Sequence, residues 1–313
     1  MRSQKRKKTW IKVTLIVFAL LLIGGGAYAF TVYQTLNKAV ETMNEPIDRE
    51  KSTRRVEEVK FEELQPFSML LLGVDEREND VGRSDTIIVV TVNPNEESIK
   101  MLSIPRDTRV DIVGQGTVDK INHAYAFGGV DMSMNTVENF LDIPIDYYMK
   151  INMEGFLDIV NAVGGVTVDN ELQFSNAGYD FPVGEVTLKG EEALAFARMR
   201  YDDPRGDFGR QERQRQMIES IIKEGASLSS LWNFDDIFAA IGSNVKTNLT
   251  FEQMIDIQQN YKRATNDITQ DQIAGSGTRI DGIYYYIVPE EERIAVQNEL
   301  KAHLELDAKP VQE

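Results

Sequence analysis

The longest apolar segment of the chain lies near its N-terminus, where residues 13–33 contain no charged side chain. Six basic residues and no acidic residue precede it within residues 1–12. About 20 apolar residues are enough to cross a bilayer, and flanking basic residues favour the cytoplasmic side. The pattern predicts a basic cytoplasmic tail over 1–12 and one transmembrane anchor over 13–33. The rest of the chain is then extracellular, as in a single-pass type II protein of the cell membrane.

A cleaved secretory signal is the alternative interpretation of this segment. Ala27, Tyr28 and Ala29 resemble a small-residue cleavage site. The apolar run is longer than the usual core of a signal peptide, however, and it continues past Ala29. We therefore favour the uncleaved anchor, and in both cases the bulk of the chain is exported.

Residues 34–66 are polar and rich in charge, with no long apolar stripe. This pattern predicts a stalk that holds a folded domain away from the membrane. Strand-like apolar runs begin near Phe67, and no internal repeat or second strong linker follows. We expect one large domain over 67–306 and a short tail over 307–313.

Three apolar runs of strand length open this domain: SMLLLGV, TIIVVTV and IKMLSIP. The NPNEE segment between the second and third runs is typical of a turn, so the pattern predicts an antiparallel meander. Asp75 then ends the first strand at the edge where Asp85 begins the second. The third strand returns to that edge and delivers Arg106 and Asp107 beside them.

Helical and strand-like segments alternate further along the chain. Alternation of this kind indicates an α/β fold, and near-continuous apolar strands predict a sheet that is buried on both faces. We expect a mixed central β-sheet covered by helices. The expected strands are 147–151, 164–168, 273–276 and 282–288, and the expected helices are 131–141, 153–163, 190–198, 208–224, 251–262 and 290–304.

Charge and composition exclude several classes of function. Without the basic tail, 28 basic residues face 50 acidic residues, a net charge of −22. Such a surface repels nucleic acid, so DNA and RNA are not expected partners. The chain has no cysteine, which excludes disulfides and thiolate chemistry. With two histidines and no G-x-S-x-G motif, neither a histidine metal cage nor a hydrolase triad is predicted.

Residues 197–216, ARMRYDDPRGDFGRQERQRQ, concentrate six arginines in this acidic protein. On a helix that turns about 100° per residue, Arg210, Arg213 and Gln214 extend the apolar stripe that follows them. Arg215 falls on the other side. An unpaired charge on the buried side is costly, so the inward arginines require an anionic partner.

Two partners fit these arginines. One is an internal salt-bridge network with Asp202, Asp203 and Asp207. The other is a bound oxyanion or phosphate, because Arg198 and Arg200 arrive at the end of the preceding helix and guanidinium groups bind phosphate in a bidentate manner. Asp75 and Asp85 leave a similar choice, since they can be turn residues or hard oxygen ligands of Mg²⁺. Together with inward arginines, we favour the phosphate and metal interpretations.

Four stretches carry a family resemblance: LLLGVDERENDVGRSDTIIVVTVNP, SIPRDTRVDI, DKINHAYAFGG and the arginine-rich segment, in this order. After a short basic tail and one anchor, they resemble the LytR-CpsA-Psr family of cell-wall ligases over most of residues 67–216. The resemblance implies an α-β-α catalytic domain. It also implies transfer of an anionic glycopolymer, expected to be wall teichoic acid, from a polyprenyl-pyrophosphate carrier to peptidoglycan. A phosphodiester to the C6 hydroxyl of N-acetylmuramic acid forms, and polyprenyl phosphate leaves.

The resemblance further implies roles for individual residues. The family's metal-binding aspartates fall on Asp75 and Asp85, with Mg²⁺ or Mn²⁺ as the ion. The general base for the sugar hydroxyl is Asp75 or Asp207. The expected partners are the lipid-linked glycopolymer, peptidoglycan and the membrane. The expected catalytic residues are Arg106, Arg210, Asp207 and Gln214, and the expected pyrophosphate-binding residues are Arg83, Arg106, Arg198, Arg200 and Arg210, to which we add Arg213 and Lys120.

Some residues have two interpretations in the sequence. The prenyl chain requires an apolar slot that opens at the arginines, but its residues resemble ordinary core. Phe208 is either a lip of this slot or a residue that anchors its helix, and His123 is expected to be structural. The DGIYYYIVP run predicts a core strand, with glycan stacking by one of the tyrosines 284–286 as the alternative.

Two other functions fit the same pattern. A pyrophosphatase would use the same site with water as the acceptor. A non-catalytic lipid-binding or regulatory membrane protein would bind the lipid without transfer. Direct regulation of DNA is not expected, because a cytoplasmic tail of about twelve residues contains no helix-turn-helix.

Overall fold

The computed structural model describes residues 51–75, 82–227 and 244–306, together with residues 30–31, 33–34, 37, 41–47 and 49. The predicted tails over 1–12 and 307–313 and nearly all of the predicted anchor over 13–33 lie outside the described residues. No helix within the described part of the chain is long and apolar enough to cross a bilayer.

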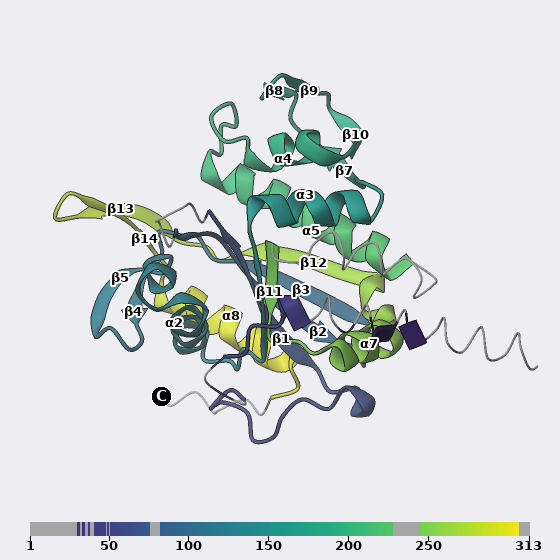
Figure 1. Ribbon diagram of the computed structural model, residues 1–313. Coiled ribbons are helices and arrows are strands. Elements are labelled where there is room, and N and C mark those ends of the chain that lie inside the picture. The colour runs from purple at the N-terminus through teal and green to yellow at the C-terminus, as the bar shows by residue number, and fades with distance from the viewer. Residues whose placement is uncertain are drawn as a thin grey trace, which may run out of the picture.

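A six-stranded mixed sheet forms the centre of the fold (Figure 1). β1 (Phe67–Val74), β2 (Ser84–Asn93) and β3 (Ser98–Ser103) form the predicted antiparallel meander. β6 (Tyr147–Ile151) lies parallel to β1, and β12 (Asp267–Gln272) lies parallel to β3. β11 (Val245–Thr247) pairs antiparallel with β6 at the other edge. The predictions of the meander, of strand 147–151 and of a mixed sheet are confirmed.

Alternate side chains of β2 explain why helices cover both faces of this sheet. Ile87 and Val89 pack in one cluster with α2 (His123–Leu141) and α8 (Glu290–His303). Ile88 and Val90 pack on the other face, in a cluster that includes α5 (Asp207–Ser227) and α7 (Phe251–Asn260). Successive residues of a strand point to opposite faces. A continuous apolar run therefore needs a helical layer on each side, as predicted.

A smaller lobe lies against α5, at the top of Figure 1. Its core contains Phe174, Phe181 and Phe196, and α5 contributes Met217 to it. α5 is therefore shared between the sheet and the lobe. The lobe consists of α3 (Met153–Ala162), α4 (Gly190–Arg198), the paired strands β7 (Val166–Asn170) and β10 (Gly184–Leu188), and the hairpin of β8 (Phe174–Asn176) and β9 (Tyr179–Phe181).

Several element boundaries differ from the predictions. The strand expected at 273–276 is wrong, because β12 ends at Gln272 and β13 (Ser276–Ile280) begins after it. β14 (Ile283–Ile287) matches the predicted strand 282–288, but it pairs with β13 in a separate hairpin and not in the core sheet. The short hairpin of β4 (Arg109–Ile112) and β5 (Thr117–Lys120) has too few apolar residues to be visible in the pattern. Helix α2 begins before the predicted residue 131 and kinks at its two glycines, 128 and 129.

The segment predicted as a stalk belongs, in large part, to the folded body. Met43 and Phe61 are buried. Salt bridges rather than an apolar stripe dock this segment, which is why the hydrophobic pattern did not reveal it. The folded domain therefore begins upstream of Phe67. The docking pairs are Arg49 with Glu138, Arg54 with Asp142 and Arg55 with Asp146.

We predict that Arg55 holds this segment on the body. Its guanidinium donates to both carboxylate oxygens of Asp146, at 2.9 and 2.8 Å, and the two side chains are 11% and 6% exposed. Removal of one partner leaves a buried charge uncompensated, so Arg55→Ala should lower the free energy of unfolding by about 3 kcal/mol. Arg263, with an 81% exposed side chain, supplies the control variant Arg263→Ala. Equal urea midpoints for the two variants would contradict the prediction.

Candidate functional site

The ends of β1 and β2 bring two aspartates to one edge of the sheet. Asp75 directly follows β1, and Asp85 is the second residue of β2. Gly73 pairs with Thr86 but Val74 pairs with Ser84, so the register shifts and Asp85 has no partner in the ladder. An extra residue of this kind is a β-bulge, which re-aims its side chain. The bulge turns Asp85 toward the segments that meet at this edge.

Arg106 follows β3 and binds the same edge. Its Nη1 donates to Oδ1 of Asp85 at 2.7 Å. Burial opposes the charge of the guanidinium, but the hydrogen bond to Asp85 and the charges of Asp85, Asp207 and Asp107 raise the pKa of Arg106 above its usual value. The predicted arrival of Arg106 beside Asp85 is confirmed.

The first turn of α5 adds a second charge pair. Nη2 of Arg210 lies 2.7 Å from Oδ1 of Asp207 and donates to the backbone carbonyl of Asp85 at 3.4 Å. Oδ2 of Asp207 accepts from the Gln211 side chain at 3.0 Å. Nε of Arg200 lies 3.8 Å from Oδ1 of Asp207. Asp207 therefore orients two arginines next to the sheet edge.

These residues form one cluster, named the clamp: Arg106, Arg200, Arg210, Asp85 and Asp207. Other predicted phosphate-binding residues lie around it. Arg83 is exposed directly before β2, and Arg198 is exposed at the C-terminal end of α4. Lys120 ends β5, and its Nζ donates to Asp107 at 2.7 Å.

Arg213 points into the lobe and not toward the clamp. It is buried, and its Nη1 donates to Oδ2 of Asp203 at 2.6 Å. Its guanidinium carbon lies 5.3 Å from the ring centroid of Phe174. Burial lowers the pKa of Arg213, and Asp203 offsets part of that effect. The expectation that Arg213 meets a bound anion is therefore replaced by the internal ion pair.

Arg215 also differs from the prediction. The single apolar stripe places it on the outer side of α5, but its side chain is buried and Nη1 donates to Oγ of Ser103 on β3 at 2.9 Å. One face of α5 packs on the sheet and another on the lobe. A helix between two layers has two buried faces, so one stripe does not describe it.

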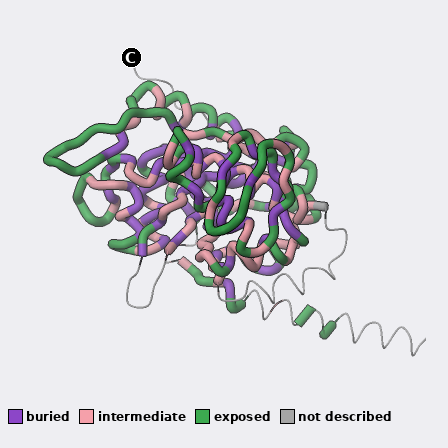
Figure 2. The backbone as a smooth tube through the Cα atoms, turned by 90° about the horizontal axis from the view of Figure 1, so that it is seen from above, coloured by how far each residue is buried: buried purple, intermediate pink, exposed green. Residues whose placement is uncertain are grey.

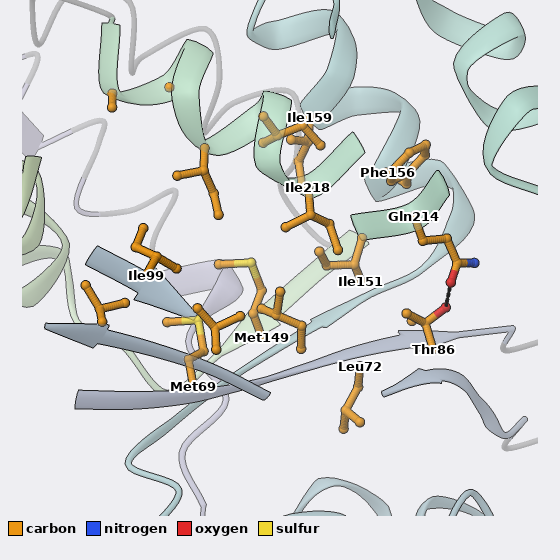
Figure 3. Close-up of a pocket in the computed structure, with 18 of the residues that line it drawn as sticks. Met69, Leu72, Thr86, Ile99, Met149, Ile151, Phe156, Ile159, Gln214 and Ile218 are labelled. Carbon is orange, nitrogen blue, oxygen red and sulfur yellow. Dashed lines mark hydrogen bonds between the residues drawn. The ribbon is translucent and has the colours of Figure 1, made fainter. Parts of the chain in front are cut away.

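An apolar cavity of about 450 Å³ lies between the sheet and helices α3, α5 and α7 (Figure 3). At one end, the hydroxyl of Thr86 donates to the amide oxygen of Gln214 at 3.0 Å. Gln214 lies one turn along α5 from Arg210, and Arg198 also lines the cavity. One end of the cavity therefore lies next to the clamp residues Asp85 and Arg210. Its apolar walls include Met69, Leu71, Val90, Met149, Ile151, Phe156, Ile159, Ile218, Ile221, Ile222, Met254 and Ile257.

A second cavity, of about 540 Å³, lies on the lobe side of the arginines. Tyr179 of β9, Glu191 of α4 and the exposed Tyr201 line it. Arg198 lines both cavities, and Arg200 lines the second. The sequence contained no signal for this space, because the β8–β9 hairpin that borders it was not predicted.

The two edge aspartates suit a hard divalent cation whose remaining ligands are water and phosphate oxygens. Asp75 and Asp85 lie at the ends of paired strands. Among the described residues, no group of three or more histidine, cysteine, aspartate or glutamate side chains could hold a metal ion. Mg²⁺ commonly takes one or two carboxylates and completes its shell with water and substrate phosphates. The donor set suits that arrangement and does not form an all-protein cage.

The rings of His123 and Phe208 both make contacts with other aromatic rings. His123 binds Asp119 at 2.7 Å through Nδ1, and its ring contacts Phe127. These local contacts agree with the structural role expected for His123. Phe208 is exposed in the first turn of α5, and its ring centroid lies 5.7 Å from that of Tyr286 on β14.

Known proteins are similar to this chain in sequence and in fold. The model of the LytR-CpsA-Psr (LytR_cpsA_psr) family matches residues 29–302. The polyisoprenyl-teichoic acid–peptidoglycan teichoic acid transferase TagU of Bacillus cereus is 52% identical over 304 residues, covering 97% of this chain and 99% of that protein. The crystal structure of B. subtilis TagU is 51% identical with a TM-score of 0.64, covering 79% of this chain and 100% of that one. A structure of TagT bound to LIIa-WTA is 35% identical with a TM-score of 0.71, covering 82% and 97%.

Arg210 and Arg213 should separate anion binding from stability. Arg213→Ala leaves Asp203 without its buried partner, so we expect a loss of about 3 kcal/mol in unfolding free energy. Arg210→Ala removes a cation from the clamp, so we expect inorganic pyrophosphate to bind at least about tenfold more weakly. We expect a smaller loss of stability than in Arg213→Ala, because the side chains of Arg210 and Asp207 are 13% and 21% exposed, against 4% and 0% for Arg213 and Asp203. Urea denaturation and calorimetric titration measure the two effects. The reverse pattern, with pyrophosphate affinity lost only in Arg213→Ala, would place the anion site in the lobe.

Proposed function

The chain belongs to the LytR-CpsA-Psr family, and we propose that it is a transferase that moves teichoic acid from a polyisoprenyl carrier to peptidoglycan. The observation that carries this proposal is the continuity of two sites. An apolar cavity of about 450 Å³ ends beside a cluster of arginines and carboxylates, because Thr86, which follows Asp85, and Gln214, one turn from Arg210, line it. A lipid-linked pyrophosphate needs both, because its chain must leave water and its phosphates must meet cations.

The same geometry suggests how the donor binds. The prenyl chain enters the cavity between the sheet and α5, where the lining surface is almost all apolar. The pyrophosphate then lies at the clamp, within reach of Arg106, Arg198 and Arg210. Guanidinium groups bind phosphate through paired hydrogen bonds. The carboxylates that now hold two of these arginines position them for the phosphates.

We propose an in-line displacement at the phosphorus that carries the polymer. The C6 hydroxyl oxygen of N-acetylmuramic acid forms the new bond to this phosphorus. The bond from the same phosphorus to the bridging oxygen breaks, and polyprenyl phosphate leaves with the electron pair. The hydroxyl proton passes to a carboxylate at the edge or to solvent. Arginines at fixed positions stabilise the charge that develops on the leaving phosphate.

Asp207 acts in this scheme as a positioning residue. Its two oxygens are engaged, one by Arg210 and Arg200 and the other by Gln211. Gln214, bound to Thr86 at the cavity mouth, lies where the lipid chain meets the pyrophosphate. Asp75 and Asp85 are proposed to hold Mg²⁺ or Mn²⁺. Such an ion would neutralise and orient the phosphates.

We also propose that the chain is a single-pass membrane protein with its catalytic domain outside the cell. The apolar run over 13–33 supports this placement. The ring of Tyr33 lies 5.6 Å from that of Phe251 on α7, and other α7 residues line the apolar cavity. The end of the proposed anchor is thus next to a wall of the lipid site, which suits a donor that arrives within the membrane.

The transfer itself can be tested with the full-length protein in detergent. We expect that a prenyl-pyrophosphate-linked disaccharide, uncross-linked peptidoglycan chains and Mg²⁺ yield a sugar phosphodiester on muramic acid, detected by mass spectrometry. Arg210→Ala should lower the rate by about 100-fold, because it removes a donor to the developing charge. Arg263→Ala, at an exposed arginine, should not change it. Free sugar phosphate without adduct would indicate a pyrophosphatase, and intact lipid would indicate a binding protein.

The metal proposal predicts a shift in metal dependence. Asp85→Asn removes a charged oxygen ligand, so we expect the Mg²⁺ concentration for half-maximal transfer to rise at least about tenfold. Mn²⁺ binding in the presence of pyrophosphate, followed by electron paramagnetic resonance, should weaken in parallel. Asp111→Asn, at an exposed aspartate on β4, is the matched control. Identical metal titrations for the two variants would rule out Asp85 as a ligand.

A further inference from the structure

The hairpin of β13 and β14 stands out from the body at the edge that carries the clamp (Figure 1). Residues 274–284 are all exposed, and this stretch is the long green loop at the left of Figure 2. Its base is fixed to the site. The N–H of Tyr286 donates to the carbonyl of Asp107 at 2.8 Å, and Tyr286 forms a β-bridge with Thr108. Asp107 directly follows Arg106, so the base of the hairpin lies next to the clamp.

Three aromatic rings extend from the clamp along this hairpin. Phe208, in the first turn of α5, contacts the ring of Tyr286, whose N–H is bonded to Asp107 beside Arg106. Tyr284 lies two residues from Tyr286 on β14, and alternate residues of a strand share a face. Phe208, Tyr286 and Tyr284 are named the aromatic strip. Its two ends, Phe208 and Tyr284, are exposed.

Two glycines allow the tyrosine rings of the strip to lie against the backbone. A Cβ added to Gly277 would come within 2.5–2.9 Å of the ring and hydroxyl atoms of Tyr284, and one added to Gly275 would come within 2.8 Å of the Tyr286 ring. Each ring therefore covers a glycine. Tyr284 is 41% exposed, so part of this side chain remains open to solvent. A flat, exposed ring of this kind is a platform for the apolar face of a sugar.

The order of residues along α5 shows which substrate can reach the strip. Phe208 and Arg210 lie in its first turn, Gln214 lies at the mouth of the apolar cavity, and Ile218 lies within it. The clamp thus separates the strip from the lipid cavity. In-line displacement requires the attacking and leaving oxygens to lie on opposite sides of the phosphorus. Since the lipid phosphate leaves on the cavity side, the attacking hydroxyl approaches from the side of the strip.

We propose that the aromatic strip binds the glycan chain of the acceptor, peptidoglycan, and directs its hydroxyl into the clamp. This inference rests on the transferase function proposed above. The polar cavity beside Arg198 and Arg200 offers the donor's own sugars a separate space. Stacking on Tyr284 requires no particular substituent on the sugar. It therefore suits a long, repetitive acceptor that must be bound at any point along its length.

Positive charge next to the strip fits the same occupant. Nζ of Lys120 lies 6.0 Å from the ring centroids of both Tyr284 and Tyr285, and the guanidinium of Arg109 lies 5.8 Å from the centroid of Tyr285. The stem peptides of peptidoglycan carry free carboxylates next to their glycan chain. Lys120 already binds Asp107, so the exposed Arg109 is the cation that we expect to meet a carboxylate beside the stacking platform.

The test is steady-state transfer by the full-length protein in detergent, with the concentration of uncross-linked peptidoglycan chains varied. Tyr284→Ala should raise the acceptor KM about 3- to 10-fold, the usual range for one lost aromatic stacking contact, with kcat and the donor KM unchanged. Tyr284→Phe keeps the ring and should recover most of the lost acceptor affinity. Gly277→Ala should raise the acceptor KM as well, because its new Cβ displaces the Tyr284 ring. Ile283→Ala is the matched control, since Ile283 is 51% exposed on the opposite face of β14.

Other outcomes would overturn the proposal. An unchanged acceptor KM in Tyr284→Ala would remove the strip from acceptor binding, and a raised donor KM would assign it to the donor glycan. An equal effect of Ile283→Ala would mean that hairpin integrity matters and the ring does not. If the wild-type protein forms no adduct, the transferase function fails by itself. Calorimetric titration of peptidoglycan chains into wild type and Tyr284→Ala then decides on the strip separately.

Discussion

Arg106 and Asp85 lie 2.7 Å apart at a sheet edge that water reaches only in part. A guanidinium in this position loses much of its hydration, and nearby carboxylates must compensate for the loss. Those carboxylates come from β2, from the turn after β3 and from the start of α5. The charge of Arg106 is therefore stabilised only when three elements are in place together. The bulge in β2 brings Asp85, the turn after β3 brings Asp107 and the start of α5 brings Asp207. Phosphates that enter the site meet cations that are already oriented, so little reorganisation accompanies binding.

Helix α5 sets the order in which the clamp and the apolar cavity follow one another. Its first turn carries the clamp residues Asp207 and Arg210, and its middle carries Gln214 at one end of the apolar cavity. Ile218, Ile221 and Ile222 in its second half line that cavity. Arg213 and Arg215 fix the helix from two sides, one to Asp203 in the lobe and the other to Ser103 on β3. Both are buried charges whose loss would free the helix to shift. The positions of Asp207 and Arg210 therefore depend on two arginines that lie outside the clamp.

The sequence predicted most of the sheet and its edge, because β1 to β3 are apolar runs separated by turns and their ends carry Asp85 and Arg106. It failed where burial on two sides hides the period, as with Arg215. For Arg213 it predicted the buried position but favoured a bound anion over Asp203 as the partner. Arg49 and Arg55 dock the predicted stalk through ion pairs, and an apolar pattern does not contain such contacts. The cavity walls were equally hidden, since Ile218 and Met149 look like core in any sequence. What makes them a binding site is space between layers, which only the packing of α5 and α7 over the sheet creates.

The acidic surface gives the clamp a selective role. The chain has a formal charge of −16, so an anionic polymer is repelled wherever it comes within about one Debye length, roughly 8–10 Å at physiological salt. In the proposed function, the arginines of the clamp supply local attraction, which acts on the terminal phosphates of the polymer. The apolar cavity contributes burial energy of about 25 cal/mol per Å², and only the lipid-linked donor can use it. Once transfer separates the polymer from its lipid, the polymer loses that contribution while the acidic surface still repels it. The same two features that select the donor therefore favour release of the polymer product.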